Sequence, residues 1–214
     1  MLLQLAIDRL EGLFAQQQAD DVIDIIEVGT PMIQRFGLSL VMEMKSRTLH
    51  PILADLKIVD GGREEAEAAF RAGAKFVTVL AMASTTTKQL VFEVARQWDG
   101  YVVLDTLGMR TADIFDRRWP DELAYVLLHA NSDAAKSGQD SLLDRVRQDL
   151  AAEFPHRRLA LAGGIVPDKV DALIALGPQV LVVGSAIYMA QNPREVASAI
   201  RQRMTNAGTG WPWQ

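Results

Sequence analysis

The chain has 214 residues, 49% of them hydrophobic and 23% charged, and its 22 Lys and Arg against 27 Asp and Glu give a formal net charge of −5. This balance is typical of an ordinary globular protein and excludes wholesale disorder, and a mildly acidic chain is a poor candidate for a nucleic-acid partner held by general electrostatics. The absence of cysteine excludes disulfides and thiolate metal sites and is compatible with the cytoplasm, where we expect the protein to act. No apolar run approaches 18 residues, so we expect no membrane partner, and the first ten residues read as a strand rather than a signal peptide.

Short runs rich in leucine and β-branched residues recur along the whole chain and predict eight strands. Most of these runs are continuously apolar, which is typical of parallel strands buried on both faces. The predicted strands are 2–7, 22–28, 52–57, 75–80, 100–105, 123–129, 157–162 and 179–183.

Helical spacing of apolar residues appears between several of these strands, over 61–72, 85–98, 167–176 and 193–203. The alternation predicts an α/β fold with right-handed crossovers, and eight units in this length favour a single-domain (β/α)8 TIM barrel over residues 1–203. A doubly wound sheet is the alternative, because periodicity alone cannot show that the sheet closes. Residues 204–214 form a tail with two tryptophans around a proline, which we expect to pack on the barrel or on a partner subunit.

Ionisable residues gather where the predicted strands end, which is the face on which TIM barrels build their active sites. They are Asp8, Glu27, Asp55, Lys57, Asp60, Asp105 and His129. Asp55 and Lys57 are two residues apart, so a strand places both on one face, and a buried ion pair there is costly unless it serves the site. The functional interpretation is a carboxylate that binds metal or substrate and a lysine that stabilises a negative substrate oxygen; a structural ion pair is the alternative. His129 is either a general acid or base near neutral pH or a hydrogen-bonded histidine at the barrel mouth.

Glycines follow the last two predicted strands, at Gly163, Gly164 and Gly184, and Ser185 adds a hydroxyl donor. Loops at these places in a TIM barrel commonly bind phosphate through backbone N–H groups. Turns use glycine for other reasons, so each glycine alone is weak evidence. The two loops together predict a phosphate site.

Asp55, Lys57 and Asp60 form an Asp-x-Lys-x-x-Asp pattern on the third predicted strand, and this pattern resembles the orotidine 5′-phosphate decarboxylase superfamily. Within it the chain is most similar to the 3-hexulose-6-phosphate synthase family. The segments that carry the resemblance are LQLAID at 3–8, DIIEVGTP at 24–31, ADLKIVDGG at 54–62, AGAKFVTVL at 72–80, LAGGI at 161–165 and VVGSAIYMAQNP at 182–193.

The resemblance implies a Mg²⁺-dependent aldolase that joins formaldehyde and D-ribulose 5-phosphate reversibly into a 3-hexulose 6-phosphate through an enediolate. It assigns Glu27 and Asp55 to the metal and Lys57 to the enediolate. Asp8 and His129 would line the substrate, and the glycines and Ser185 named above would hold its phosphate. It also implies a homodimer in which Asp60 reaches the neighbouring subunit's site.

Two other functions stay open on the sequence. The 3-keto-L-gulonate 6-phosphate decarboxylases resemble the chain too, but they tend to carry arginine where it has Ser132. A barrel that binds sugar phosphates without catalysis is the second, and the intact acidic and lysine residues argue against it.

The segments 106–120 and 130–135 depart from the synthase pattern and follow strands at the predicted site.

Overall fold

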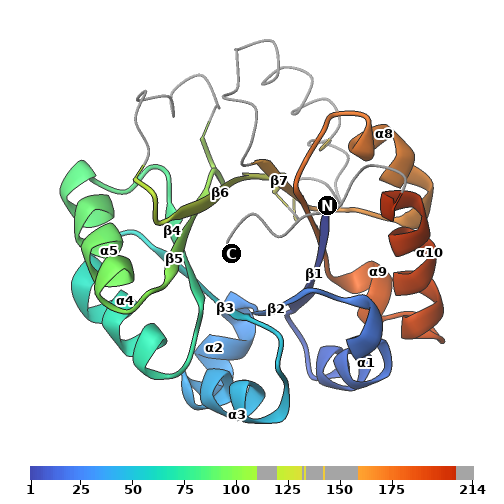
Figure 1. Cartoon of the computed structure of the whole chain (residues 1–214), viewed down its shortest axis with the longest axis horizontal. Helices are drawn as coiled ribbons and strands as arrows, with labels where there is room; N and C mark the ends of the chain where they lie inside the picture. The colour runs from blue at the N-terminus through green and yellow to red at the C-terminus, as the bar shows by residue number, and fades with distance from the viewer. Residues whose placement is uncertain (110–119, 132, 134–141, 143–158, 206–214) are drawn as a thin grey trace.

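The computed structural model describes residues 1–109, 120–131, 133, 142 and 159–205, and its strands form a closed parallel barrel (Figure 1). Each strand pairs with its sequence neighbour, and β8 pairs with β1 in the register Leu2 to Val180, which closes the ring. The TIM barrel is therefore confirmed, and the doubly wound sheet is excluded. The strands are β1 (Leu2–Ile7), β2 (Ile25–Val28), β3 (Ile52–Ile58), β4 (Phe76–Leu80), β5 (Tyr101–Asp105), β6 (Leu123–His129), β7 (Leu159–Ala162) and β8 (Val180–Val183).

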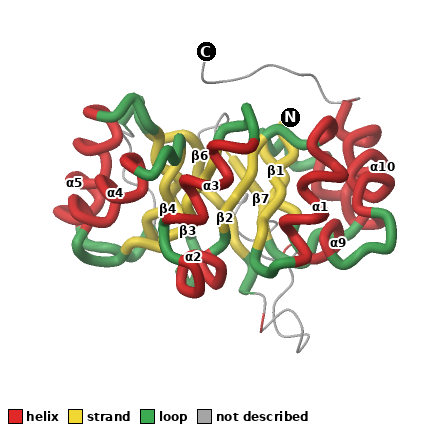
Figure 2. Tube along the Cα trace, turned by 90° about the horizontal axis from the view of Figure 1, so that it is seen from below, coloured by secondary structure: helices red, strands yellow, loops and turns green. Residues whose placement is uncertain are grey.

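Helices surround the barrel, and in the side view they flank the strands at both edges of the molecule (Figures 1 and 2). They are α1 (Glu11–Ala19), η1 (Asp20–Val22), α2 (Thr30–Phe36), α3 (Ser39–Arg47), α4 (Gly62–Arg71), α5 (Thr85–Gln97), η3 (Pro167–Lys169), α8 (Val170–Ile174), α9 (Ser185–Tyr188) and α10 (Pro193–Thr205). In the part of the chain that the structure describes, no helix has the length and apolarity to cross a membrane.

Most predicted boundaries differ from the structure by one or two residues, and three differences concern how the elements pack. The second strand begins at Ile25 rather than at residue 22, because Asp20–Val22 form the 3₁₀ turn η1. The predicted helix 167–176 opens as the 3₁₀ turn η3 before α8. Helix α10 continues to Thr205, and its Met204 is buried. Residues 206–214, where the tail was expected to pack, lie outside the described residues.

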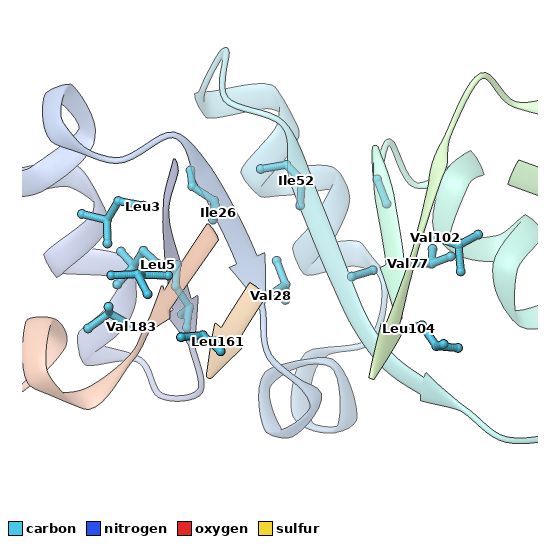
Figure 3. Packing of buried hydrophobic residues seen from close by; sticks show 14 of the residues in the cluster. Leu3, Leu5, Ile26, Val28, Ile52, Val77, Val102, Leu104, Leu161 and Val183 are labelled. Atoms are coloured by element: carbon cyan, nitrogen blue, oxygen red, sulfur yellow. The ribbon is translucent and has the colours of Figure 1, made fainter. Parts of the chain in front are cut away.

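Two apolar layers hold the fold, and strand alternation separates them. On β1, Leu3 and Leu5 belong to the large cluster between strands and helices (Figure 3), whereas Leu2 and Ala6 belong to the smaller cluster inside the barrel. This two-sided burial explains the continuously apolar strand sequences. Buried polar side chains also lie on the strands or directly after them: Gln4, Glu27, Asp55, Thr78, Asp105 and Thr106.

Candidate active site

Strand β3 carries a bulge where the predicted Asp55–Lys57 pair lies. Between Ala54 and Ile58, four steps along β3 match two steps along β4. Lys57 takes a positive φ of 49°, which is uncommon for a residue other than glycine. Its backbone N–H donates to the Thr78 hydroxyl oxygen at 2.8 Å, which fastens the bulge to β4. Bulges are frequent beside active sites because they redirect side chains.

The Asp55 carboxylate is buried and held by three side chains. Its Oδ1 accepts a hydrogen bond from the Thr78 hydroxyl at 2.8 Å, and its Oδ2 accepts from the Thr30 hydroxyl at 2.8 Å and from the Lys57 ammonium. Burial disfavours the charged carboxylate, but the Lys57 charge and these hydrogen bonds outweigh it, so the pKa of Asp55 is lowered. Asp55 is therefore an ionised group at neutral pH.

Lys57 lies among carboxylates rather than in an apolar pocket. Its Nζ contacts Asp55 and lies 3.9 Å from Asp105 Oδ2. Burial works against the charged amine, yet Asp55, Asp105 and Glu27 outweigh it and raise the pKa of Lys57. The expected contact between Asp55 and Lys57 is thus confirmed, although a bulge makes it instead of a regular strand. A charged amine is a poor nucleophile and a good partner for a negative oxygen.

Asp105 joins Lys57 to His129. The Asp105 carboxylate, at the end of β5, is fully buried, and its Oδ2 lies 3.0 Å from Nδ1 of His129 at the end of β6. Its Oδ1 accepts the Leu107 backbone N–H at 2.9 Å, which fixes the carboxylate from the other side. A carboxylate oxygen accepts a hydrogen bond at this distance, which favours the His129 tautomer that carries its hydrogen on Nδ1 and leaves Nε2 as the acceptor nitrogen. This is the orientation that a carboxylate gives to a general base.

Glu27 and Asp8 end the two strands next to this group. Burial and then the Asp55 charge raise the pKa of Glu27 well above its ordinary value, and the same two causes raise the pKa of Asp8. Gly29 provides the space for Asp8, since a Cβ at residue 29 would lie 2.1 Å from Asp8 Oδ1. Both carboxylates therefore belong to the same electrostatic cluster as Asp55.

The donor set of this cluster fits a hard divalent cation. Glu27 and Asp55 are adjacent carboxylates, and the charge of one makes the other harder to ionise, a cost that a bound cation would remove. Within the described ranges, no group of three or more Asp, Glu, His or Cys side chains is arranged as a complete metal site. Mg²⁺ does not require one, because it is usually held by one or two carboxylates and keeps water or substrate oxygens as its other ligands.

The glycine loops follow the adjacent strands β7 and β8. Gly163 has a φ of +104°, and a Cβ there would lie 2.6 Å from the Ala130 carbonyl oxygen, so both its conformation and its contacts require glycine. Gly164 also has a positive φ and is exposed. Gly184 precedes α9, whose first residue is the exposed Ser185. Their assignment to phosphate stays a prediction.

Asp60 stands apart from the carboxylate cluster. It is exposed beyond the end of β3, and among the described residues it makes no hydrogen bond or ion pair. Ser132 and most of the segments 106–120 and 130–135 that depart from the synthase pattern lie outside the described residues.

Four residues that support the site were not predicted from the sequence. Thr30 and Thr78 hold Asp55, and Gln4 and Tyr125 form hydrogen bonds that lead to Glu27. Gln4 carried a usable signal, because it is the one polar residue of the run LLQLAI and shares the inward parity of Asp8. Thr78 is likewise the polar residue inside FVTVL.

Comparison with known proteins gives relatives over nearly the whole chain. The 3-hexulose-6-phosphate synthase of Staphylococcus haemolyticus is 31% identical over 207 residues, which cover 94% of this chain and 97% of the relative. The corresponding synthase of Staphylococcus aureus (strain USA300) shows the same identity and coverage. The sequence-based resemblance to this synthase family, and with it the prediction of an enzyme of this type, is confirmed.

Solved structures agree with these relatives. The crystal structure of 3-hexulose-6-phosphate synthase from Salmonella typhimurium superposes with a TM-score of 0.86 at 32% identity, covering 97% of this chain and all of the other. The 3-keto-L-gulonate-6-phosphate decarboxylase from Vibrio cholerae superposes with a TM-score of 0.76 at 24% identity over 99% of each chain, which shows a common fold. The model of the Orotidine 5'-phosphate decarboxylase / HUMPS family matches residues 1–200, and the chain belongs to this family.

Proposed function

We propose that the protein joins formaldehyde and D-ribulose 5-phosphate, reversibly and with Mg²⁺, into a 3-hexulose 6-phosphate. The observation that carries the proposal is the constellation of Asp55, Lys57 and the Asp105–His129 pair at one barrel mouth. The names of the synthase relatives support the same substrates.

The reaction needs a base that removes a proton from the substrate carbon beside the carbonyl. His129 Nε2 suits this role, because Asp105 holds the Nδ1 hydrogen and stabilises the imidazolium that forms. The electron pair left on carbon spreads into an enediolate, which then attacks the formaldehyde carbon. The new alkoxide takes up the proton held by the imidazolium, which returns His129 to its neutral form and balances the addition.

Lys57 stabilises the enediolate by charge. Its ammonium is kept protonated by the surrounding carboxylates and forms no covalent bond with the substrate. Glu27 and Asp55 would hold Mg²⁺, which when bound supplies further positive charge to the substrate oxygens. Asp8 offers a carboxyl oxygen to substrate hydroxyls at the same mouth, and the loops after β7 and β8 would bind the phosphate.

The proposal includes a homodimer acting in the cytoplasm. Asp60 is exposed and separate from the Asp55 cluster within its own chain, which suits a residue donated to the partner's site. The apolar side chain of Val59, next to Asp60 in the sequence, is 54% exposed. An exposed apolar side chain here supports the proposal that this segment is buried against another subunit.

The decisive assay measures formaldehyde consumption by the purified protein with D-ribulose 5-phosphate and Mg²⁺, with product identification by NMR. A parallel reaction with 3-keto-L-gulonate 6-phosphate measures carbon dioxide release, and release faster than formaldehyde consumption would favour the decarboxylase. Exchange of the substrate's α-proton in deuterated water tests the non-catalytic alternative. A protein that binds the sugar phosphate but neither exchanges the proton nor consumes formaldehyde would contradict the proposal.

A further inference from the structure

A chain of hydrogen bonds crosses the barrel interior beneath the site. The Tyr125 hydroxyl on β6 donates to the Gln4 carbonyl oxygen Oε1 on β1, and the Gln4 amide Nε2 donates to Glu27 Oε2 on β2. Gln4 and Tyr125 have 0% exposure and Glu27 has 8%. Three polar groups from three strands are thus linked without solvent.

The surroundings make these groups expensive to bury. The interior layer around them is otherwise apolar, with Leu2, Ile25, Leu53, Phe76, Val103 and Val180 among its members. A buried amide or hydroxyl costs free energy unless its hydrogen bonds are satisfied, and leucine and phenylalanine would fill similar volumes without that cost. The series of hydrogen bonds is not confined to residues that only support the fold. It ends on the carboxylate of Glu27, which belongs to the site.

The order of donors fixes the direction of the Gln4 amide. The Tyr125 hydroxyl donates to Oε1, which leaves the other end of the amide, the donor Nε2, facing the Glu27 carboxyl oxygen. In the register of β1 and β2, Gln4 lies opposite Ile25 and Glu27 lies opposite Ala6. The Gln4 side chain therefore extends two residues toward the C-terminal ends of the strands to contact Glu27. The Tyr125 ring packs near Phe76, with 6.4 Å between ring centroids, in the same closely packed layer.

The hydrogen bond from Gln4 occupies one of the two oxygens of the Glu27 carboxylate. Among the described residues, Gln4 provides the single side-chain hydrogen bond to the Glu27 carboxylate, and it goes to Oε2. Oε1 is left as the oxygen available to the site. Carboxylates that bind metals are commonly held in this way by an outer hydrogen bond.

We propose that Gln4 and Tyr125 are positioning residues for Glu27: Tyr125 sets the direction of the Gln4 amide, and Gln4 holds the carboxylate in the orientation that binds a divalent cation. The inference rests on the proposed function for the role of Glu27.

The test measures Mn²⁺ binding to the whole protein by electron paramagnetic resonance, without substrate. Gln4→Leu removes the donor at similar volume, and we expect the Mn²⁺ dissociation constant to rise about 10- to 100-fold. Tyr125→Phe keeps the ring and the fold and removes the outer hydrogen bond, so we expect a smaller rise of about 2- to 10-fold.

Two matched controls separate positioning from general stability. Gln16→Leu removes another buried glutamine amide that donates to a carboxylate, that of Asp20, away from the site. Tyr101→Phe changes the other tyrosine whose ring lies beside Phe76; Tyr101 begins β5, at the end of the barrel away from the site. Both controls should bind Mn²⁺ within about twofold of the wild type, even where urea unfolding shows lower stability.

Folded Gln4→Leu and Tyr125→Phe variants that bind Mn²⁺ as the wild type does would overturn the inference, and so would controls that weaken binding equally. A wild-type protein that binds Mn²⁺ but does not consume formaldehyde would overturn the proposed reaction alone. A wild-type protein that binds no Mn²⁺ would overturn this inference and the proposed metal together.

Discussion

The left-handed backbone at Lys57 leads to a prediction that separates the fold of the site from its chemistry. Replacing Lys57 by alanine or by glycine removes the same ammonium and leaves Asp55 with the same two threonine hydroxyls. The two variants therefore differ mainly in the cost of a φ of 49°. A left-handed conformation costs alanine about 1–2 kcal/mol, whereas glycine adopts it freely but loses about 0.5–1 kcal/mol more conformational freedom on folding. Lys57→Gly should be the more stable variant by about 0.5–1 kcal/mol.

Lys88 provides the matched control. It lies inside α5, where its ammonium donates to the Ala81 carbonyl oxygen, and its φ is not positive. In a helix interior glycine is less favourable than alanine by about 1 kcal/mol, so the order of the two variants should reverse. The difference between glycine and alanine should therefore change by about 1.5–2 kcal/mol between positions 57 and 88.

Urea unfolding followed by circular dichroism measures all four variants at one protein concentration, because subunit association would otherwise change the apparent stability. Formaldehyde consumption should fall by about 10²-fold or more in both Lys57 variants, the usual effect of removing a preorganised donor, and should persist in both Lys88 variants. If Lys57→Ala is more stable than Lys57→Gly, the same order as expected at position 88, the backbone at Lys57 is not held in the left-handed region and the argument fails.

Three further predictions concern the metal, the subunits and the glycine loops. Exhaustive chelation should abolish formaldehyde consumption and Mg²⁺ should restore it; full activity of the chelated protein would contradict the assignment of Glu27 and Asp55. Mixing inactive Asp60→Asn with inactive Glu27→Gln should regain activity, because one site of the mixed dimer has both wild-type residues, and no recovery despite proven subunit exchange would count against a shared site. Gly163→Ala should lower stability and raise the KM for the sugar phosphate more than Gly164→Ala does. Only the alanine at position 163 places a Cβ against a backbone carbonyl, 2.6 Å from Ala130 O. Urea unfolding and kinetics of the two variants check this, and a larger effect of Gly164→Ala would refute it.

The barrel was predictable because strand identity depends on local apolar runs, and seven of the strand positions began within two residues of the prediction. The ionisable strand ends were predictable for the same reason, since parallel strands bring their carboxyl ends to one face. The bulge was not, because nothing in the letters of ADLKI indicates a positive φ at a lysine. Gln4 and Tyr125 were missed because their roles depend on which strands face one another across the closed barrel, and that is decided by register.

The distribution of charge around the barrel mouth predicts the orientation in which the substrate binds. Carboxylates lie at or near the C-terminal ends of β1, β2, β3 and β5, and Lys57 is the cation among them. A phosphate placed among them would meet repulsion. The loops after β7 and β8 instead offer backbone N–H groups, and the segments 163–166 and 184–185 contain no acidic residue. We therefore expect the sugar phosphate to bind with its phosphate toward β7 and β8 and its carbonyl end toward β3, where the cation and Lys57 act on the oxygen that gains charge.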